Sequence, residues 1–187
     1  MARRVLAFDP PERFVAGTVG QPGERTFFLQ ARRGRAVTSV TLEKAQAAAL
    51  AERIDELLDE VLRRSAGEAD IPVAGTAEAL DTDPLESPIV AEFRIGAMAL
   101  GWDPADERLV IEAHATVDDE DVEVPELGSD DPDGPDCLRV RITGAQARAF
   151  ARRTAALVAA GRPPCPFCHQ PLDPAGHICP RANGYRR

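Results

Sequence analysis

The sequence contains few aromatic residues, a single lysine and no long apolar run. Phe, Trp and Tyr together make up 5% of the 187 residues, so Ala, Val and Leu must supply most of a core. No segment approaches the roughly 20 apolar residues that a membrane-spanning helix needs, and the start MARRVLAFDP lacks the apolar stretch of a signal peptide. We therefore expect a cytoplasmic protein without membrane insertion, whose thiols stay reduced.

Motifs that mark common active sites are also missing. The sequence has neither a G-x-x-x-x-G-K-[ST] nor a G-x-G-x-x-G loop to hold phosphate groups. The acidic run at 118–121 lacks the ligand spacing of an EF-hand. A single histidine in a predicted strand, such as His114, is more often structural than a general base, although Glu112 and Thr116 share its face and keep a catalytic alternative open. These absences favour a non-enzymatic protein.

The composition is that of one compact domain with an uneven charge distribution. Apolar residues make up 44% and charged residues 28% of the chain, which suffices for a core. Fourteen acidic residues and one basic residue lie between Asp103 and Asp136, whereas nine arginines and one acid lie between Arg139 and Arg187. Either these are two solvated surfaces that attract each other, or the basic one binds an anion or an acidic partner.

The first half of the chain predicts three antiparallel strands and a helix. The strands are expected at Arg13 to Val19, Thr26 to Ala31 and Ala36 to Leu42, because β-branched and apolar residues there flank Gly-rich turns. Apolar residues then recur every three or four positions from Glu43 to Arg64, which indicates an amphipathic helix that ends before Gly67.

The second half predicts the same order of elements. Strands are expected at Ile89 to Leu100, Arg108 to Val117 and Leu138 to Ile142, and a helix from Gly144 to about Ala160. The Pro/Asp/Gly-rich spacers at 65–87 and 118–136 are expected to be irregular or mobile.

A comparison of the two halves indicates an internal repeat. Nineteen residues from Val40 and nineteen from Val140 are identical at eight positions with a constant offset of 100. Alanine-rich helices can match through composition alone, so chance similarity is the alternative to duplication. The predicted fold class is α+β, with antiparallel sheet or sheets built from β-β-β-α halves at 1–64 and 89–160 and both helices covering an apolar face. This scaffold would occupy residues 1–161.

The C-terminal segment 162–187 predicts a structural zinc knuckle. Its sequence CPFCHQPLDPAGHIC carries two cysteines separated by two residues and, after eight intervening residues, the tripeptide HIC. Three thiolates and one imidazole form the tetrahedral donor set that Zn2+ prefers, and four protein ligands leave no position for substrate. The segment is too short for a core of its own, so zinc would supply its folding free energy. The predicted ligands are Cys165, Cys168, His177 and Cys179.

Two alternatives to this ligand set remain open, and one further cysteine lies outside the segment. A redox C-x-x-C pair would normally open a helix after a strand, but two prolines precede Cys165 and no helical pattern follows. His169 occupies a position where zinc knuckles often have a glycine with positive φ, and it could instead ligate in place of His177. The fourth cysteine, Cys137, begins a predicted strand and is expected to be a buried apolar residue.

The arginine-rich C-terminal third is the predicted contact surface for an unidentified protein partner or an anion. Arginine forks suit carboxylate and phosphate groups, and a nearby tyrosine adds a flat contact. The alternative is that the protein's own acidic residues at 118–136 neutralise these arginines. An enzyme or small-ligand pocket between the two halves and weak nucleic-acid binding through the arginine-rich C-terminus are the other functions considered. The predicted contact residues are Arg148, Arg152, Arg153, Arg181 and Tyr185.

The C-terminal pattern C-P-x-C…H-x-C-P-R-x-N-G-Y is the most specific feature of the chain. Together with the chain length and the short F-D-P segment near the start, it resembles the family catalogued as Domain of Unknown Function 3090. The resemblance covers the whole chain and implies a cytoplasmic actinobacterial protein of unassigned activity. His169 departs from the family pattern, in which a small residue is expected at that position.

Overall fold

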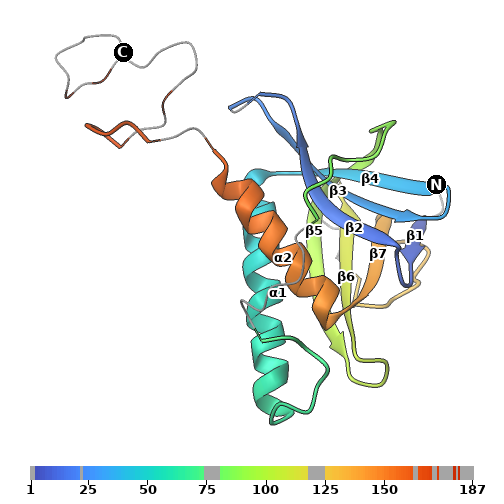
Figure 1. The fold of residues 1–187 in the computed structure, drawn as a ribbon. Coiled ribbons are helices and arrows are strands. Elements are labelled where there is room, and N and C mark those ends of the chain that lie inside the picture. The colour runs from blue at the N-terminus through green and yellow to red at the C-terminus, as the bar shows by residue number, and fades with distance from the viewer. Residues whose placement is uncertain are drawn as a thin grey trace.

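A computed structural model describes residues 3–21, 23–73, 81–117, 125–161 and 164–169, together with residues 172, 179 and 181. In this part of the chain, two helices pack on a seven-stranded sheet, which places the protein in the predicted α+β class (Figure 1). In chain order the elements are β1 (Val5–Phe8), β2 (Arg13–Val19), β3 (Thr26–Arg33), β4 (Ala36–Leu42), α1 (Lys44–Arg64), β5 (Ala91–Asp103), β6 (Arg108–Ala115), β7 (Cys137–Thr143) and α2 (Gly144–Ala159).

The strands follow the order β1-β7-β6-β5-β4-β3-β2 across the sheet. The strands β2, β3 and β4 form one antiparallel meander that is followed by α1, and β5, β6 and β7 form a second one that is followed by α2. The expectation of a purely antiparallel sheet is wrong at two places, because β4 pairs with β5 and β1 with β7 in parallel. A parallel pair needs a crossover, and α1 with residues 65–90 supplies it between β4 and β5.

The strand β1 was not predicted from the sequence. Its four residues are too few to establish an alternating pattern, and Pro10 follows shortly after its end. It forms because β7 offers it a free edge, with Val5 opposite Cys137 and Phe8 opposite Val140. The other strands and both helices begin and end within about three residues of their predicted positions.

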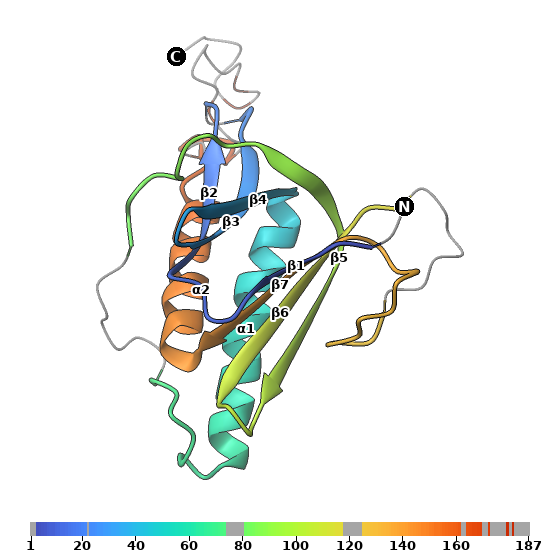
Figure 2. The same ribbon diagram turned by 90° about the vertical axis from the view of Figure 1, so that its right-hand side faces the viewer.

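The two helices lie side by side on one face of the strongly curved sheet (Figures 1 and 2). Their contact is close because small buried residues face it, including Ala47 and Ala51 of α1 and Ala147 and Ala151 of α2. The ring of Phe150 stacks on that of Phe14 in β2, with 4.6 Å between centroids, and this contact fixes α2 against the first meander.

The outer face of the sheet is covered by connecting segments rather than by helices. Residues 81–89 cover β2 and β3, where Leu85 packs with Val15 and Phe28. The buried amide of Gln30 holds this segment, since it donates to Glu86 O and accepts from Glu86 N–H. The described parts of the spacers therefore contain no helix or strand, as expected, but their expected mobility is not supported because they are bonded to the sheet. Residues 74–80 and 118–124 lie outside the described part.

Candidate metal centre and charged surfaces

The segment after α2 forms a tight turn around its first cysteine pair. Cys165 and Cys168 lie on either side of this turn, and His169 N–H closes it by donating to Cys165 O at 2.9 Å. His169 has a φ of +60°, so it adopts the left-handed conformation in which a glycine is usual. The interpretation of His169 as a residue in a glycine position is therefore confirmed.

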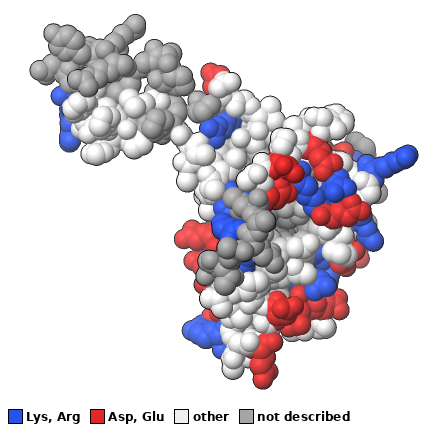
Figure 3. All heavy atoms as spheres, in the orientation of Figure 1, with Lys and Arg blue, Asp and Glu red and all other residues white. Residues whose placement is uncertain are grey.

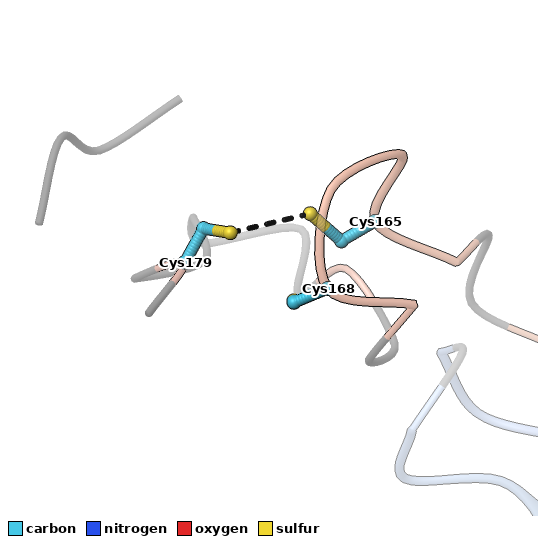
Figure 4. Close-up of side chains that lie close together, drawn as sticks. All are labelled: Cys165, Cys168 and Cys179. Carbon is cyan, nitrogen blue, oxygen red and sulfur yellow. Dashed lines mark hydrogen bonds between the residues drawn. The ribbon is translucent and has the colours of Figure 1, made fainter. Parts of the chain in front are cut away.

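Three thiol groups converge at this turn. The Sγ atoms of Cys165, Cys168 and Cys179 lie within 4.8 Å of one another, and none of the three cysteines is in a disulfide. The Sγ atoms of Cys165 and Cys179 face each other at 3.8 Å (Figure 4). Two zinc–sulfur bonds of about 2.3 Å at a tetrahedral angle separate their sulfurs by about 3.8 Å, whereas a disulfide needs about 2.0 Å. The spacing therefore fits two ligands of one ion.

The electrostatics of the turn favour the thiolate form of Cys165. The backbone N–H groups of Cys168 and Phe167 and the neighbouring thiols lower the pKa of Cys165 to about 6, against the opposing effect of its burial. A thiolate is the form that binds metal, so these groups prepare the turn for a cation. Cys165 and Cys179 are 2% and 3% exposed, which shields the sulfurs from water.

The fourth predicted ligand, His177, lies outside the described residues, so its role stays a prediction. Among the described residues the metal-ligating group comprises the three cysteines and does not include His169, whose side chain is exposed. The structure brings together the three cysteines that the sequence proposed as ligands, and their binding of zinc stays a prediction. The geometry supports a site of at least three ligands, which could hold a metal ion.

The arginines of α2 do not form a free basic surface. Arg148 is only 10% exposed and pairs with Asp55 and Asp59 of α1, and it also donates to Pro72 O. Arg153 is 12% exposed and pairs with Asp81. Acidic and basic side chains are accordingly interspersed over the body of the protein in the view of Figure 3.

The acidic partners of these arginines differ from those that charge patterning suggested. The sequence pointed to residues 118–136, but Arg148 and Arg153 pair with acids between 55 and 81. In the described part of the spacer, Asp130 and Asp136 pair instead with Arg139 and Arg4. Charge patterning along a sequence cannot distinguish these pairings, because all of them except Asp130–Arg139, which are nine residues apart, join residues far apart in the chain.

The remaining predicted contact residues lie in different places. Arg152 is half-buried on α2 and has interactions of its own. Arg181 is exposed and donates from Nη1 to Phe167 O at 3.2 Å, so it lies beside the cysteine turn. Tyr185 lies outside the described residues. The structure thus brings Arg181, but not Arg148 or Arg153, to the metal centre.

Two surface hollows are large enough for a small molecule. One, of about 760 Å³, lies between the two halves and is lined by residues of β3, β4, β5 and both helices, with the cations Arg25, Lys44 and Arg94. The other, also of about 760 Å³, lies on the outer face beside Trp102 and Arg139. Both volumes fall in the range of about 300–1,000 Å³ that is common for ligand sites.

The sequence placed Glu112 and His114 on one strand face but did not show that Cys137 lies beside them. All three are fully buried on the outer face of β6 and β7, and their ligand atoms lie within 4.8 Å of one another. The burial predicted for Cys137 is confirmed. The two-residue spacing of Glu112 and His114 on β6 indicated that these two side chains share a face. The position of Cys137 beside them depends on the register between β6 and β7, which the sequence does not show.

Fold and site together define an α+β protein whose C-terminal segment carries a three-cysteine group that could hold a metal ion. The family model described as "Protein of unknown function (DUF3090)" matches residues 6–179, and the chain belongs to this family. The match confirms the resemblance of the C-terminal pattern. No curated protein and no solved structure matches the chain. Neither described helix has the length and hydropathy that a bilayer crossing requires.

Proposed function

We propose that the protein is a non-enzymatic zinc-binding adaptor or regulator. Cys165, Cys168 and Cys179 hold a structural Zn2+ ion together with His177, and the surface beside the ion contacts a protein partner. The convergence of three cysteine thiols, with 3.8 Å between two of the sulfurs, carries this proposal. Four protein ligands would close the coordination shell, which favours a structural ion over a hydrolytic one.

The zinc content of the purified protein tests the metal assignment. Wild-type protein should hold about one zinc ion per chain more than the double variant Cys165→Ser/Cys168→Ser, because the variant loses two thiolate ligands. Elemental analysis of both proteins, purified without added metal, gives this difference directly. Equal zinc contents, or a disulfide between Cys165 and Cys168 in reducing buffer, would contradict the assignment.

The partner surface is proposed to lie beside the cysteine turn, at Arg181 and the exposed Phe167. Arg181 is the predicted contact residue that the structure describes next to the metal centre. The change Arg181→Glu should reduce partner recovery at least about tenfold in affinity purification from the native host, without a change in melting temperature. The control Arg35→Glu makes the same charge change at an exposed position of the β3–β4 turn and should retain the partner. Equal recovery with both variants would remove this surface from the proposal.

A small-ligand-binding protein, whether or not an enzyme, is the second candidate. The groove between the halves supports it, because its lining carries the cations Arg25, Lys44 and Arg94 against one acid, Glu43, which pairs with Arg94. Weak nucleic-acid binding through the C-terminal arginines is a third candidate and would appear as a strongly salt-dependent affinity. The net charge of −9 makes it the weakest of the three.

We also infer that the two β-β-β-α halves arose by duplication. In support, Gln46 and Gln146, at the offset of 100, each accept a hydrogen bond from the backbone N–H of the residue three positions earlier, Glu43 and Thr143. Each of these pairs begins the helix that follows a three-stranded meander. A cytoplasmic, actinobacterial origin remains a prediction from the family resemblance and the composition.

A further inference from the structure

The buried cluster on the outer face of the sheet has the arrangement of a second metal site. Glu112 and His114 are two residues apart on β6, so their side chains project from the same face. The strand register places Cys137 of β7 directly opposite His114. Residues 125–136 and Arg3 cover this face, since Gly128 N–H donates to Glu112 and Arg3 donates to Ser129 O.

Only some of the polar atoms of this cluster have hydrogen-bond partners. Glu112 Oε1 accepts from Gly128 N–H at 3.0 Å and from Arg139 Nε at 2.5 Å. Among the described residues, Glu112 Oε2 and both ring nitrogens of His114 have no hydrogen-bond partner. His114 Nε2 lies 3.3 Å from Glu112 Oε2, but the two groups are not oriented for a hydrogen bond. Fully buried polar atoms without partners are rare, and here they belong to two neighbouring side chains whose ligand atoms lie within 4.8 Å of the Cys137 thiol.

We propose that Glu112, His114 and Cys137 bind one Zn2+ ion, or another divalent ion of similar softness. Carboxylate, imidazole and thiolate are the three donor types that zinc uses in proteins, whereas Mg2+ and Ca2+ require oxygen ligands throughout. One carboxylate and one thiolate neutralise the charge of the ion. Three protein ligands leave one coordination position for water or another small ligand.

The surroundings of the cluster orient its ligands. Glu112 Oε1 accepts hydrogen bonds from Arg139 and Gly128, which leaves Oε2 for the ion. The guanidinium of Arg139 is held in turn by Asp130 and by Ser129 O. Such outer hydrogen bonds commonly position metal-binding carboxylates. Burial lowers the pKa of His114, which keeps the imidazole neutral and its lone pair available. Burial also raises the pKa of Cys137 to about 11, so the ion must displace the thiol proton, which passes to solvent.

Arg3 opposes the ion, and this opposition provides a test. Its positive charge favours the deprotonated form of both Cys137 and His114. A positive charge beside a cation weakens binding, so Arg3→Gln should tighten metal binding at least about threefold. The alternative is that the cluster holds a buried water molecule. In that case the cluster would not bind metal, and Arg3→Gln would produce no increase in metal affinity.

The direct experiment uses full-length protein in which the C-terminal site has been removed by Cys165→Ser, Cys168→Ser and Cys179→Ser. This background variant is titrated with Co2+ alone, both in the folded state and during refolding, because the cluster is buried. We expect one equivalent to bind and to show a thiolate-to-cobalt charge-transfer band. The further change Cys137→Ala should abolish the band and weaken binding at least about 100-fold.

Circular dichroism of the Cys137→Ala protein shows whether it has folded. If it has not, X-ray absorption of the cobalt-loaded background variant identifies the atoms that coordinate the ion. We expect one sulfur and two or more nitrogen or oxygen neighbours. Failure to bind Co2+ in both titrations would overturn the proposal. Binding without a sulfur neighbour would overturn it as well, since it would place the ion on exposed carboxylates. Neither result affects the C-terminal zinc assignment, which is measured in the wild-type protein.

Discussion

Replacing Cys168 by serine is expected to unfold the C-terminal segment and to leave the seven-stranded sheet intact. Structural zinc contributes on the order of 10–16 kcal/mol in comparable small sites, and a segment with so few apolar residues has no other source of folding free energy. The main core lies entirely in residues 8–151, and its partly buried surroundings extend to Val158, so it does not depend on the cysteine turn. Hydrogen exchange should show loss of protection at 164–181, with unchanged far-UV circular dichroism.

The variant His169→Gly is the matched control in the same turn. Glycine adopts a φ of +60° without strain, so this change should preserve both the zinc ion and the protection of the segment. If His169→Gly loses zinc, then His169 rather than His177 is the fourth ligand. If Cys168→Ser unfolds the whole protein, the division into a scaffold at 1–161 and a C-terminal appendage is wrong.

Truncating Arg153 to alanine is expected to lower the free energy of unfolding by about 2 kcal/mol. Its guanidinium donates to Ala16 O at 2.9 Å, to Asp83 O at 2.7 Å and to both the carboxylate and the backbone carbonyl of Asp81. These bonds join α2 to β2 and to the segment that covers the outer face. The side chain is 12% exposed, and its loss removes a donor from the carbonyl of the buried Ala16. Asp81 is 37% exposed and can be partly hydrated, which limits the effect.

Arg53 provides the control, because it occupies the equivalent position in the first half at the offset of 100. Its side chain is 74% exposed and, within the described part of the chain, forms its ion pair with Glu56 one turn away, so Arg53→Ala should change stability by no more than about 0.5 kcal/mol. Urea denaturation of both variants gives the comparison. Equal effects would mean that the contacts of Arg153 contribute no more than a surface ion pair.

The contrast between Arg53 and Arg153 also bears on function. If Arg153→Ala destabilises the protein and leaves partner binding unchanged, the arginines of α2 stabilise the fold and do not contact the partner. The partner surface is then confined to the neighbourhood of Arg181 and Phe167. This outcome would narrow the adaptor proposal to the C-terminal segment, where the metal ion would organise the contact.

The sequence by itself predicted most of the local elements and the three cysteines that lie together in the candidate metal centre. Alternating residues such as those of β7 and three-to-four spacing such as that of α1 are properties of short segments, so they can be read without the fold. The C-P-x-C pair likewise places two thiolates in one turn whatever surrounds them. The positive φ of His169 followed from the same local geometry.

Only the tertiary structure decided which distant residues meet. Arg148 bonds to Asp55 across 93 residues and Arg153 to Asp81 across 72, and no local pattern distinguishes these acids from the many others. The four-residue β1 forms only because β7 presents an edge to it. The cluster of Glu112, His114 and Cys137 depends on the register between β6 and β7, and a shift of one residue would turn Cys137 to the opposite face. Pairings of this kind depend on how all the elements pack together, so no short segment of the sequence reveals them.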